Sequence, residues 1–173
     1  MPVNILSAAE LPLSPWPNKA GRKADIASGP GWMVAFAWLD QEARFSDYTG
    51  TDRTITLIDG DGFVLHFDNG ADVAVAPLSP TPFDGGLGLT CHLPYGPCRV
   101  LNVMTERGRV GHHVRIGTDG GDRFGSGVLV ALEDGAIINC NGQARALTRW
   151  DSVVAERLED IGTTGLFASI SIA

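Results

Sequence analysis

The sequence predicts an all-β protein, and three observations support that prediction. Short apolar or alternating segments recur about every 8 to 12 residues, which is the spacing of strands in sandwiches and barrels. Turns rich in Asp, Asn and Gly separate these segments, and 22 glycines and 10 prolines among 173 residues favour short strands over long helices. No long amphipathic helical pattern interrupts the series.

The chain begins with an expected edge strand at Val3–Ser7. The segment Leu11–Gly31 contains four prolines and no sustained periodicity. Because proline donates no hydrogen bond to a sheet, we expect a long ordered loop there and neither a helix nor a central strand. Trp32–Leu39 is short and almost wholly apolar, which predicts a strand covered on both faces, although a buried helix has the same pattern.

A predicted hairpin follows in the middle of the chain. Residues 53–59 alternate apolar and threonine side chains, which is strand periodicity. The acidic, glycine-containing segment 59–62 suits a hairpin turn, so residues 63–68 are expected to return as the partner strand of 53–59. A second turn at 68–70 leads into another strand at 71–76.

The next part of the chain repeats the pattern of loop and strand. Residues 77–86 are rich in proline and are predicted to form a second loop. Strands are expected at 87–93 and 98–105. A further strand at 112–117 precedes a predicted turn at 119–122.

The C-terminal part reads as strand, acidic turn, strand, Asn-Gly turn and strand over residues 127–149. Residues 151–160 are the one stretch compatible with a short helix, and 166–172 form an apolar final strand. The segment Thr56–Gly70 is similar to Val130–Gly142, so the same hairpin is expected twice. This repetition favours two similar β-lobes.

Charge and cysteine content narrow the possible partners. The formal net charge is −7 and the isoelectric point is near 4.9, which disfavours nucleic acid and anionic membrane surfaces, because both attract basic proteins. No stretch resembles a signal peptide or a transmembrane helix, so we expect a cytoplasmic protein. The three cysteines lack a CxxC spacing and are expected to be ordinary core thiols.

Three motifs, taken together, resemble the HutD/Ves family. Pro15–Ala27 is similar to the family loop PWKNGGGxTREIA, and Phe45–Arg53 is similar to FSxFPGxDR. Phe83–Gly85 and Leu101–Met104 are similar to the FxG and DFNVM elements. The chain departs from these patterns at a few positions of the loop and of the last element, namely Pro17, Lys19, Ala20, Ala24 and Val100.

The resemblance implies a bicupin fold of two β-barrel or jelly-roll lobes joined by short segments. The lobes are expected at about residues 1–110 and 111–173, with final strands able to exchange between them. It also implies a homodimer and a non-catalytic protein that binds a small carboxylate such as formate, formiminoglutamate or a urocanate-like acid. Such a protein would sense or buffer an intermediate of histidine degradation, or act in a stress response.

Arg53 is the first candidate for ligand binding. Its guanidinium is always charged and offers a planar fork that suits a carboxylate, and the resemblance implies the same role for the matching arginine. The structural alternative is an ion pair with the neighbouring Asp52 or with another acid.

Three further residues complete the candidate binding site. Trp16 lies between two prolines and could wall a pocket while Asn18 supplies a hydrogen-bond donor and acceptor, or both could anchor the loop. Asn102 lies in an otherwise apolar strand, so its amide needs a partner that is either backbone or ligand.

We predict no catalytic residue, no metal ligand and no cofactor. Two of the four histidines, His112 and His113, are adjacent and would point to opposite faces of a strand. The alternative is a metal site assembled from His66 and His92, or one of these two histidines acting as an acid or base, and it would make the protein a cupin-superfamily enzyme. A third possibility is a purely structural β protein that associates through an exposed face.

Overall fold

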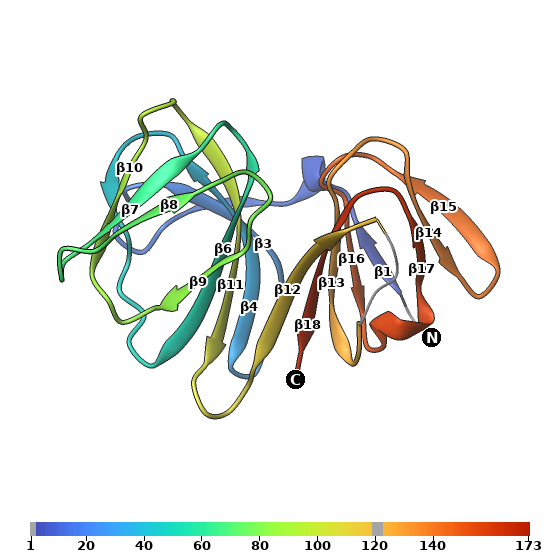
Figure 1. Cartoon of the computed structure of the whole chain (residues 1–173). Helices are drawn as coiled ribbons and strands as arrows, with labels where there is room; N and C mark the ends of the chain where they lie inside the picture. Colours follow the sequence, from blue (N-terminus) through green and yellow to red (C-terminus); the bar gives the residue numbers. More distant parts are fainter. Residues whose placement is uncertain (1–2, 119–122) are drawn as a thin grey trace. The chain divides into compact units, whose positions relative to one another are not determined.

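The computed structural model describes residues 3–118 and 123–173, which form two compact units (Figure 1). The N-terminal unit is Pro12–Val110, and the C-terminal unit combines Gly111–Ala173 with the N-terminal segment up to Leu11. That segment belongs to the second unit because β1 (Asn4–Leu6) pairs with β16 (Ser152–Ala155). The expected first lobe, residues 1–110, differs in this respect, because a pattern of apolar residues does not tell which strand an edge strand will pair with.

The N-terminal unit consists of two antiparallel sheets. The six-stranded sheet has the order β2 (Leu13–Pro15), β3 (Arg22–Gly29), β4 (Trp32–Leu39), β11 (Cys98–Glu106), β6 (Thr51–Asp59) and β9 (Thr81–Asp84). The four-stranded sheet has the order β5 (Ala43–Arg44), β10 (Leu89–His92), β7 (Phe63–Phe67) and β8 (Asp72–Val75). Side chains from both sheets meet in one core, which includes Leu57 and Val100 from the first sheet and Leu65 and Leu89 from the second.

The C-terminal unit repeats this arrangement with fewer strands. Its five-stranded sheet has the order β1, β16, β13 (Ser126–Ala131), β18 (Phe167–Ile172) and β12 (His112–Gly117). Its three-stranded sheet has the order β15 (Gln143–Leu147), β14 (Ala136–Cys140) and β17 (Gly162–Thr164). Two short 3₁₀ helices, η1 (Ala8–Glu10) and η2 (Leu158–Asp160), complete the described secondary structure. Leu129, Ile138 and Phe167 are among the buried residues that join the two sheets.

The all-β prediction is confirmed, but the two predicted hairpins are wrong. β6 pairs with β11 and β9, whereas β7 pairs with β10 and β8, so the acidic turn after β6 carries the chain from one sheet to the other. The same happens between β13 and β14. The hairpins lie one strand later, at β7–β8 and β14–β15. The internal similarity therefore marks a repeated corner between sheets, because the same residues that allow a hairpin also allow a change of sheet.

Three other segments differ from expectation. Part of the predicted loop Leu11–Gly31 is the eight-residue strand β3, which contains no proline and buries Ala24 and Ile26. β9 falls inside the second predicted loop and tolerates proline because it is an edge strand. Residues 151–160 contain β16 and a 3₁₀ turn instead of a helix. The predicted turn at 119–122 lies outside the described residues.

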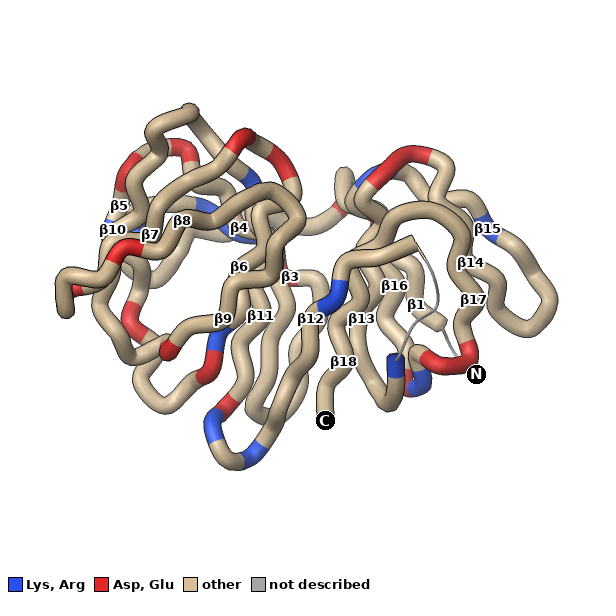
Figure 2. Tube along the Cα trace, in the orientation of Figure 1, with Lys and Arg blue, Asp and Glu red and all other residues tan. Residues whose placement is uncertain are grey.

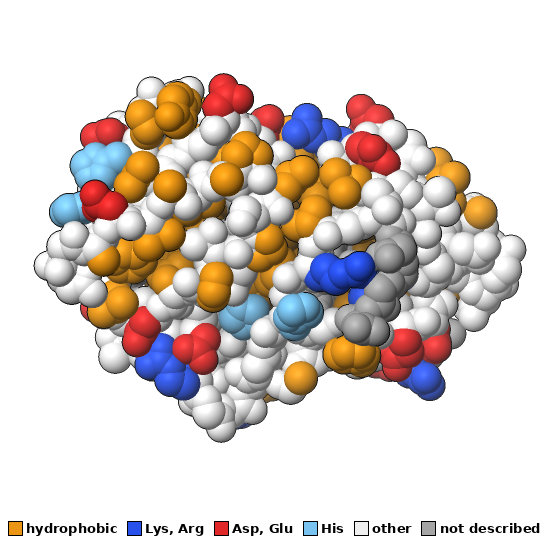
Figure 3. Space-filling view, in the orientation of Figure 1, with side chains coloured by type: hydrophobic (Ala, Val, Ile, Leu, Met, Phe, Trp, Pro, Cys, Tyr) orange, Lys and Arg blue, Asp and Glu red, His pale blue; other side chains and the backbone are white. Residues whose placement is uncertain are grey.

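Charged residues lie mainly in the connections and at strand ends, and the middle of strands such as β11 and β13 carries none (Figure 2). On the face shown in Figure 3, hydrophobic side chains reach the surface in several places between charged ones. None of the helices in the described part of the chain is long and apolar enough to cross a membrane.

Candidate functional site

Arg53 lies near the start of β6, in the interior of the N-terminal unit. On one side β6 pairs with β11, which places Arg53 opposite Met104 and diagonally adjacent to Asn102. On its other side, Arg53 pairs with Phe83 of β9. Because side chains alternate between the two faces of a strand, Arg53 lies on the inward face of β6, where it is only 6% exposed.

The Arg53 guanidinium is a buried cation for which the described residues supply no counter-ion. Nη2 donates a hydrogen bond of 3.1 Å to Asn102 Oδ1, and Nε is buried without a hydrogen-bond partner among the described residues. No carboxylate within residues 3–118 and 123–173 forms an ion pair with it. Asp52, the neighbour that could have neutralised it, instead binds Arg107 at 2.7 Å. The structural alternative of an Arg53–Asp52 ion pair is therefore wrong.

Aromatic rings partly replace the missing counter-ion. The guanidinium carbon of Arg53 lies 4.9 Å from the ring centre of Phe83 and 5.4 Å from those of Phe45 and Tyr48. Such contacts stabilise a cation by roughly 0.5 to 2 kcal/mol each, whereas burial of an ion costs several kcal/mol. Burial accordingly lowers the pKa of Arg53 to about 10, so it stays protonated at neutral pH. A buried positive charge thus remains under-compensated.

A cavity adjoins this charge. It is lined by Trp16, Lys23, Phe45, Ser46, Tyr48, Arg53 and Asn102, together with apolar residues of β4, β6 and β11. Its volume is about 40 Å³, which gives room for about three water molecules. The hydroxyl of Ser46 is also buried without a hydrogen-bond partner. One cavity therefore holds two polar groups whose hydrogen-bonding capacity the described residues leave unfilled, and hereafter we name it the Arg53 cavity.

Trp16 forms a wall of the Arg53 cavity and also anchors its own loop. Its indole Nε1 donates a hydrogen bond of 3.0 Å to the carbonyl oxygen of Arg22, and its ring meets Phe45 edge to face at 5.6 Å. Gly21 lies directly against this ring, because a Cβ at that position would be 2.7 Å from Trp16 Cε2. The glycine therefore permits the close approach that seats the indole.

The structure brings Arg53, Trp16 and Asn102 together but leaves Asn18 outside the cavity lining. Asn18 is exposed; its Nδ2 donates to the carbonyl oxygen of Arg44 at 2.7 Å, and its Oδ1 accepts from the Ala20 amide at 3.1 Å. Both ends of its side-chain amide thus hold the loop, which is the structural alternative that the sequence left open. Asn102, by contrast, has Arg53 as its partner.

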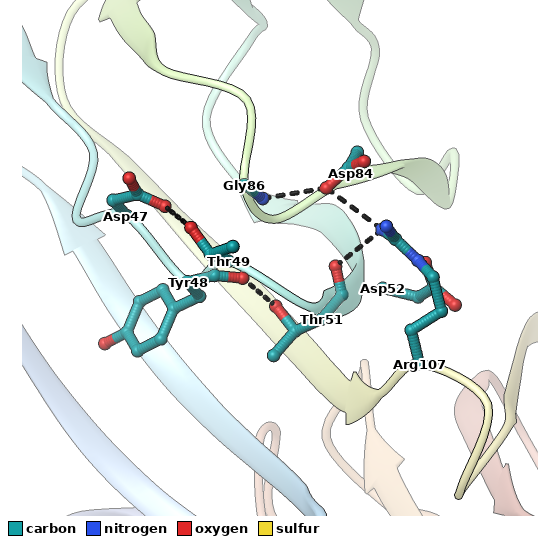
Figure 4. Close-up of polar contacts among 8 residues, drawn as sticks. All are labelled: Asp47, Tyr48, Thr49, Thr51, Asp52, Asp84, Gly86 and Arg107. Atoms are coloured by element: carbon teal, nitrogen blue, oxygen red, sulfur yellow. Dashed lines mark hydrogen bonds and ion pairs between the residues drawn. The ribbon is translucent and has the colours of Figure 1, made fainter.

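An ionic cluster around Arg107 links Thr51 and Asp52, at the start of β6, to Asp84, at the end of β9 (Figure 4). Arg107 binds Asp52 at 2.7 Å and Asp84 at 2.9 Å, and it donates to the carbonyl oxygen of Thr51 at 3.1 Å. Asp84 also accepts a hydrogen bond of 2.8 Å from the Gly86 amide. Arg107, which directly follows β11, therefore joins the start of β6 to the end of β9.

The Arg107 cluster predicts a pH dependence. The side-chain hydrogen bond from Arg107, followed by the Gly86 amide, holds the pKa of Asp84 below its ordinary value of 3.8. A lowered carboxyl pKa contributes stability that is present above pH 3.8 and is lost as the pH falls through the folded-state pKa. We expect Arg107→Met to be less stable than wild type from about pH 7 to about pH 4, with the deficit shrinking below that. Urea denaturation at several pH values measures this deficit.

Arg109→Met provides the matched control, because Arg109 is an exposed arginine of the same connection that pairs only locally with Glu106 at 2.9 Å. A deficit for Arg107→Met that stays constant to the lowest pH would contradict the assignment to Asp84.

The histidines of the enzyme alternative lie elsewhere. His66 and His92 are half-exposed on the four-stranded sheet, where they pair with Asp72 and Glu42, and neither lines the Arg53 cavity. Within the described part of the chain, no three His, Cys, Asp or Glu side chains are grouped closely enough to hold a metal ion.

Sequence reasoning missed four residues around Arg53. Phe45, Ser46 and Tyr48 lie in the same FSDYTGTDR stretch as Arg53, so the family-like motif contained them. Phe83 lies in the PFDGG stretch. The signal was the aromatic residues of these two stretches, and the pairing of β6 with β9 places Phe83 beside Arg53.

Curated relatives match part of the chain. An uncharacterized 21.2 kDa protein in the hutC 3′ region of Pseudomonas putida is 28% identical over 109 residues, which are 59% of this chain and 57% of that protein. The matched part thus spans little more than half the length of that relative. Protein Ves of Citrobacter koseri is 29% identical over 135 residues, which are 73% of this chain and 71% of Ves.

Solved structures show the same fold. HutD from Pseudomonas fluorescens SBW25, in a structure described as the formate condition, matches with a TM-score of 0.86 and 22% identity over 99% of this chain and 98% of HutD. A cupin 2 conserved barrel domain protein from Leptotrichia buccalis matches with a TM-score of 0.62 and 10% identity over 98% and 95% of the two chains. The fold is therefore all-β and cupin-like. The sequence model of the HutD family matches residues 8–166, so the chain belongs to the HutD family.

Proposed function

We propose that the protein binds a small carboxylate in the Arg53 cavity and acts as a non-catalytic binding protein. The observation that carries this proposal is the buried guanidinium of Arg53, which has no carboxylate partner among the described residues. An anion in the adjoining cavity would supply the missing counter-charge. Its two oxygens could accept hydrogen bonds from Arg53 and from the unpartnered hydroxyl of Ser46.

The environment of the cavity favours a carboxylate over water. Phe45, Tyr48 and Trp16 surround the charge with aromatic surface, and an ion pair is stronger where such surface excludes water. A hydrogen bond to a charged group contributes roughly 1.5 to 3 kcal/mol. The net charge of −7 repels anions in general, so the site attracts one through local contacts and not through the overall charge.

The size of the cavity favours the smallest acids. About 40 Å³ corresponds to a ligand of roughly three or four non-hydrogen atoms, such as formate or acetate. The P. fluorescens HutD structure in a formate condition supports formate as the first ligand to test. The resemblance to a family associated with histidine degradation makes formiminoglutamate and urocanate-like acids the next ligands, with their carboxylate at Arg53.

The residues that line the cavity support binding without chemistry. The titratable side chains in the described lining are Lys23, Tyr48 and Arg53, and Lys23 is already paired with Asp25 at 2.6 Å. This set lacks the paired acid and base that proton transfer needs.

A thermal-denaturation screen tests the proposal. We expect formate and acetate to raise the unfolding temperature and chloride at equal ionic strength to leave it unchanged. A ligand at 100 times its Kd adds about 2.7 kcal/mol to the free energy of unfolding. If no small carboxylate stabilised the protein beyond the chloride control, the proposal would be wrong.

Gly21→Ala is expected to weaken carboxylate binding indirectly, because the added methyl group displaces Trp16 and does not contact the ligand. The added methyl group would lie 2.7 Å from the Trp16 ring and force the indole away from its seat in the cavity wall. We expect roughly tenfold lower affinity, equivalent to about 1.4 kcal/mol, in calorimetric titration with formate.

Gly111→Ala is the control for this prediction, since a Cβ there would meet only the carbonyl oxygen of Ala173, at 3.8 Å. Equal formate affinities for the Gly21 and Gly111 variants would show that the position of Trp16 does not matter to the site.

A further inference from the structure

The side chain of Tyr48 lies between two pockets of the N-terminal unit. The Arg53 cavity is one of them, with a volume of about 40 Å³. The other is an open cleft of about 350 Å³ whose lining includes Trp32, Met33, Met104 and Tyr48. Met33, Tyr48 and Met104 line both pockets, so these three side chains form the partition between them. Hereafter we name the second pocket the open cleft.

The backbone of Tyr48 is fixed on both sides. Its amide donates a hydrogen bond of 2.9 Å to the carbonyl oxygen of Gly85. Its carbonyl oxygen accepts from the Thr51 amide at 3.2 Å and from the Thr51 hydroxyl at 2.7 Å. Figure 4 shows the phenol ring projecting away from Asp84 and Arg107. Rotation of the side chain is therefore the movement that this anchored residue can make without disturbing the segment.

The ring contributes to the site on its cavity side. It lies 5.4 Å from the guanidinium carbon of Arg53, within the range of a cation–π contact. Unlike Met104, which is 6% exposed, Tyr48 is partly exposed. The ring thus faces Arg53 and the solvent-open cleft at the same time, and the two methionines beside it are flexible side chains that adapt to neighbouring groups.

We propose that Tyr48 is the specificity-determining residue of the Arg53 cavity, which rests on the carboxylate-binding function proposed above. Its ring closes the cavity around acids of roughly three or four non-hydrogen atoms and separates them from the open cleft. Without the ring, the cavity and the cleft become one elongated site with Arg53 at its inner end. That site takes carboxylates that carry an apolar or aromatic body.

The chemistry of the cleft sets the class of the larger ligand. Trp32, Met33 and Met104 present an aromatic face and two thioethers, which suit a flat apolar group. The described lining of the cleft, whose polar side chains include Thr105 and Glu106, contains no lysine or arginine that would compete with Arg53 for the carboxylate. An aromatic acid such as benzoate therefore enters with its carboxylate directed inward and its ring in the cleft.

Calorimetric titration of acetate and benzoate into four forms of the protein tests this inference. Wild type is expected to bind acetate more tightly than benzoate. In Tyr48→Ala the ratio of benzoate to acetate affinity should rise at least tenfold, because the ring no longer separates cavity and cleft. Tyr48→Phe keeps the ring and should keep the wild-type ratio. Tyr95→Ala, at a tyrosine 69% exposed and outside both linings, is the control and should also keep it.

The outcomes separate this inference from the function on which it rests. Binding of neither acid by wild type would overturn both. If wild type and Tyr48→Ala both bound acetate and had the same ratio of benzoate to acetate affinity, only the role of Tyr48 as a partition would be overturned. Met104→Ala removes another side chain of the same partition and replaces the first variant if Tyr48→Ala does not fold. A tenfold rise in its ratio of benzoate to acetate affinity supports the partition, and an unchanged ratio counts against it.

Discussion

Arg53→Met is expected to abolish the stabilisation by formate and to leave the unliganded protein about as stable as wild type. The first effect follows because the substitution removes the buried cation that lines the Arg53 cavity, and with it about 2.7 kcal/mol of ligand stabilisation at 100 times Kd. The second follows from opposing terms. Removal of a buried charge that has no ion-pair partner stabilises the folded state by several kcal/mol. Loss of the cation–π contacts and loss of the hydrogen bond to Asn102 Oδ1 each destabilise the folded state by roughly 1 to 3 kcal/mol.

Urea denaturation with and without formate measures both effects. Arg22→Met serves as the control, because Arg22 is an exposed arginine of the same sheet that pairs with Asp40 at 3.1 Å. The control should retain the full formate effect. If Arg53→Met lost more than about 3 kcal/mol of stability in the absence of any ligand, Arg53 would be a structural residue and the argument from an uncompensated charge would fail.

Gly127→Ala is expected to destabilise the C-terminal unit by roughly 3 kcal/mol or more. Gly127 lies in β13 between β16 and β18. A Cβ there would lie far inside van der Waals contact with the carbonyl oxygen of Ile170 and 2.8 Å from Leu158 Cδ1. Because β18 is buried along its whole length, its backbone has no free space into which it could retreat.

Gly162→Ala is the matched control, since Gly162 is also a strand glycine of the C-terminal unit, but a Cβ there would make ordinary contacts with Asn139, at 3.5 Å from its Cβ and 3.7 Å from its carbonyl oxygen. Its stability should stay within about 0.5 kcal/mol of wild type. Similar urea midpoints for the two variants would contradict the close packing of β13 against β18.

The sequence predicted the strands of this fold better than their partners. Apolar runs such as β4, β11 and β18 are strands because continuous apolar residues need cover on both faces. The hairpin expected after β6 was wrong because Asp59–Gly62 allows both a tight turn and a corner between sheets, and long-range pairing decides between them. For the same reason the sequence assigned the first strand to the wrong unit.

The centre of the candidate site was predictable, but its surroundings were not. Arg53 stood out as a charged residue on an alternating strand, and Asn102 as an amide in an apolar one. Their hydrogen bond depends on the register of β6 and β11, which no local pattern specifies. Asn18 carried the right chemistry, yet its loop turns its amide toward the Arg44 carbonyl.

The most direct test of the central claim is the NMR signal of the Arg53 guanidinium during titration with formate. The Nε–H and Nη–H resonances of Arg53 are assigned by their absence in Arg53→Lys. If a carboxylate supplies the missing counter-charge, these resonances shift downfield and saturate with formate, while chloride at equal ionic strength leaves them in place. Arg53 resonances that stay unchanged at formate concentrations that stabilise the protein would contradict binding at Arg53.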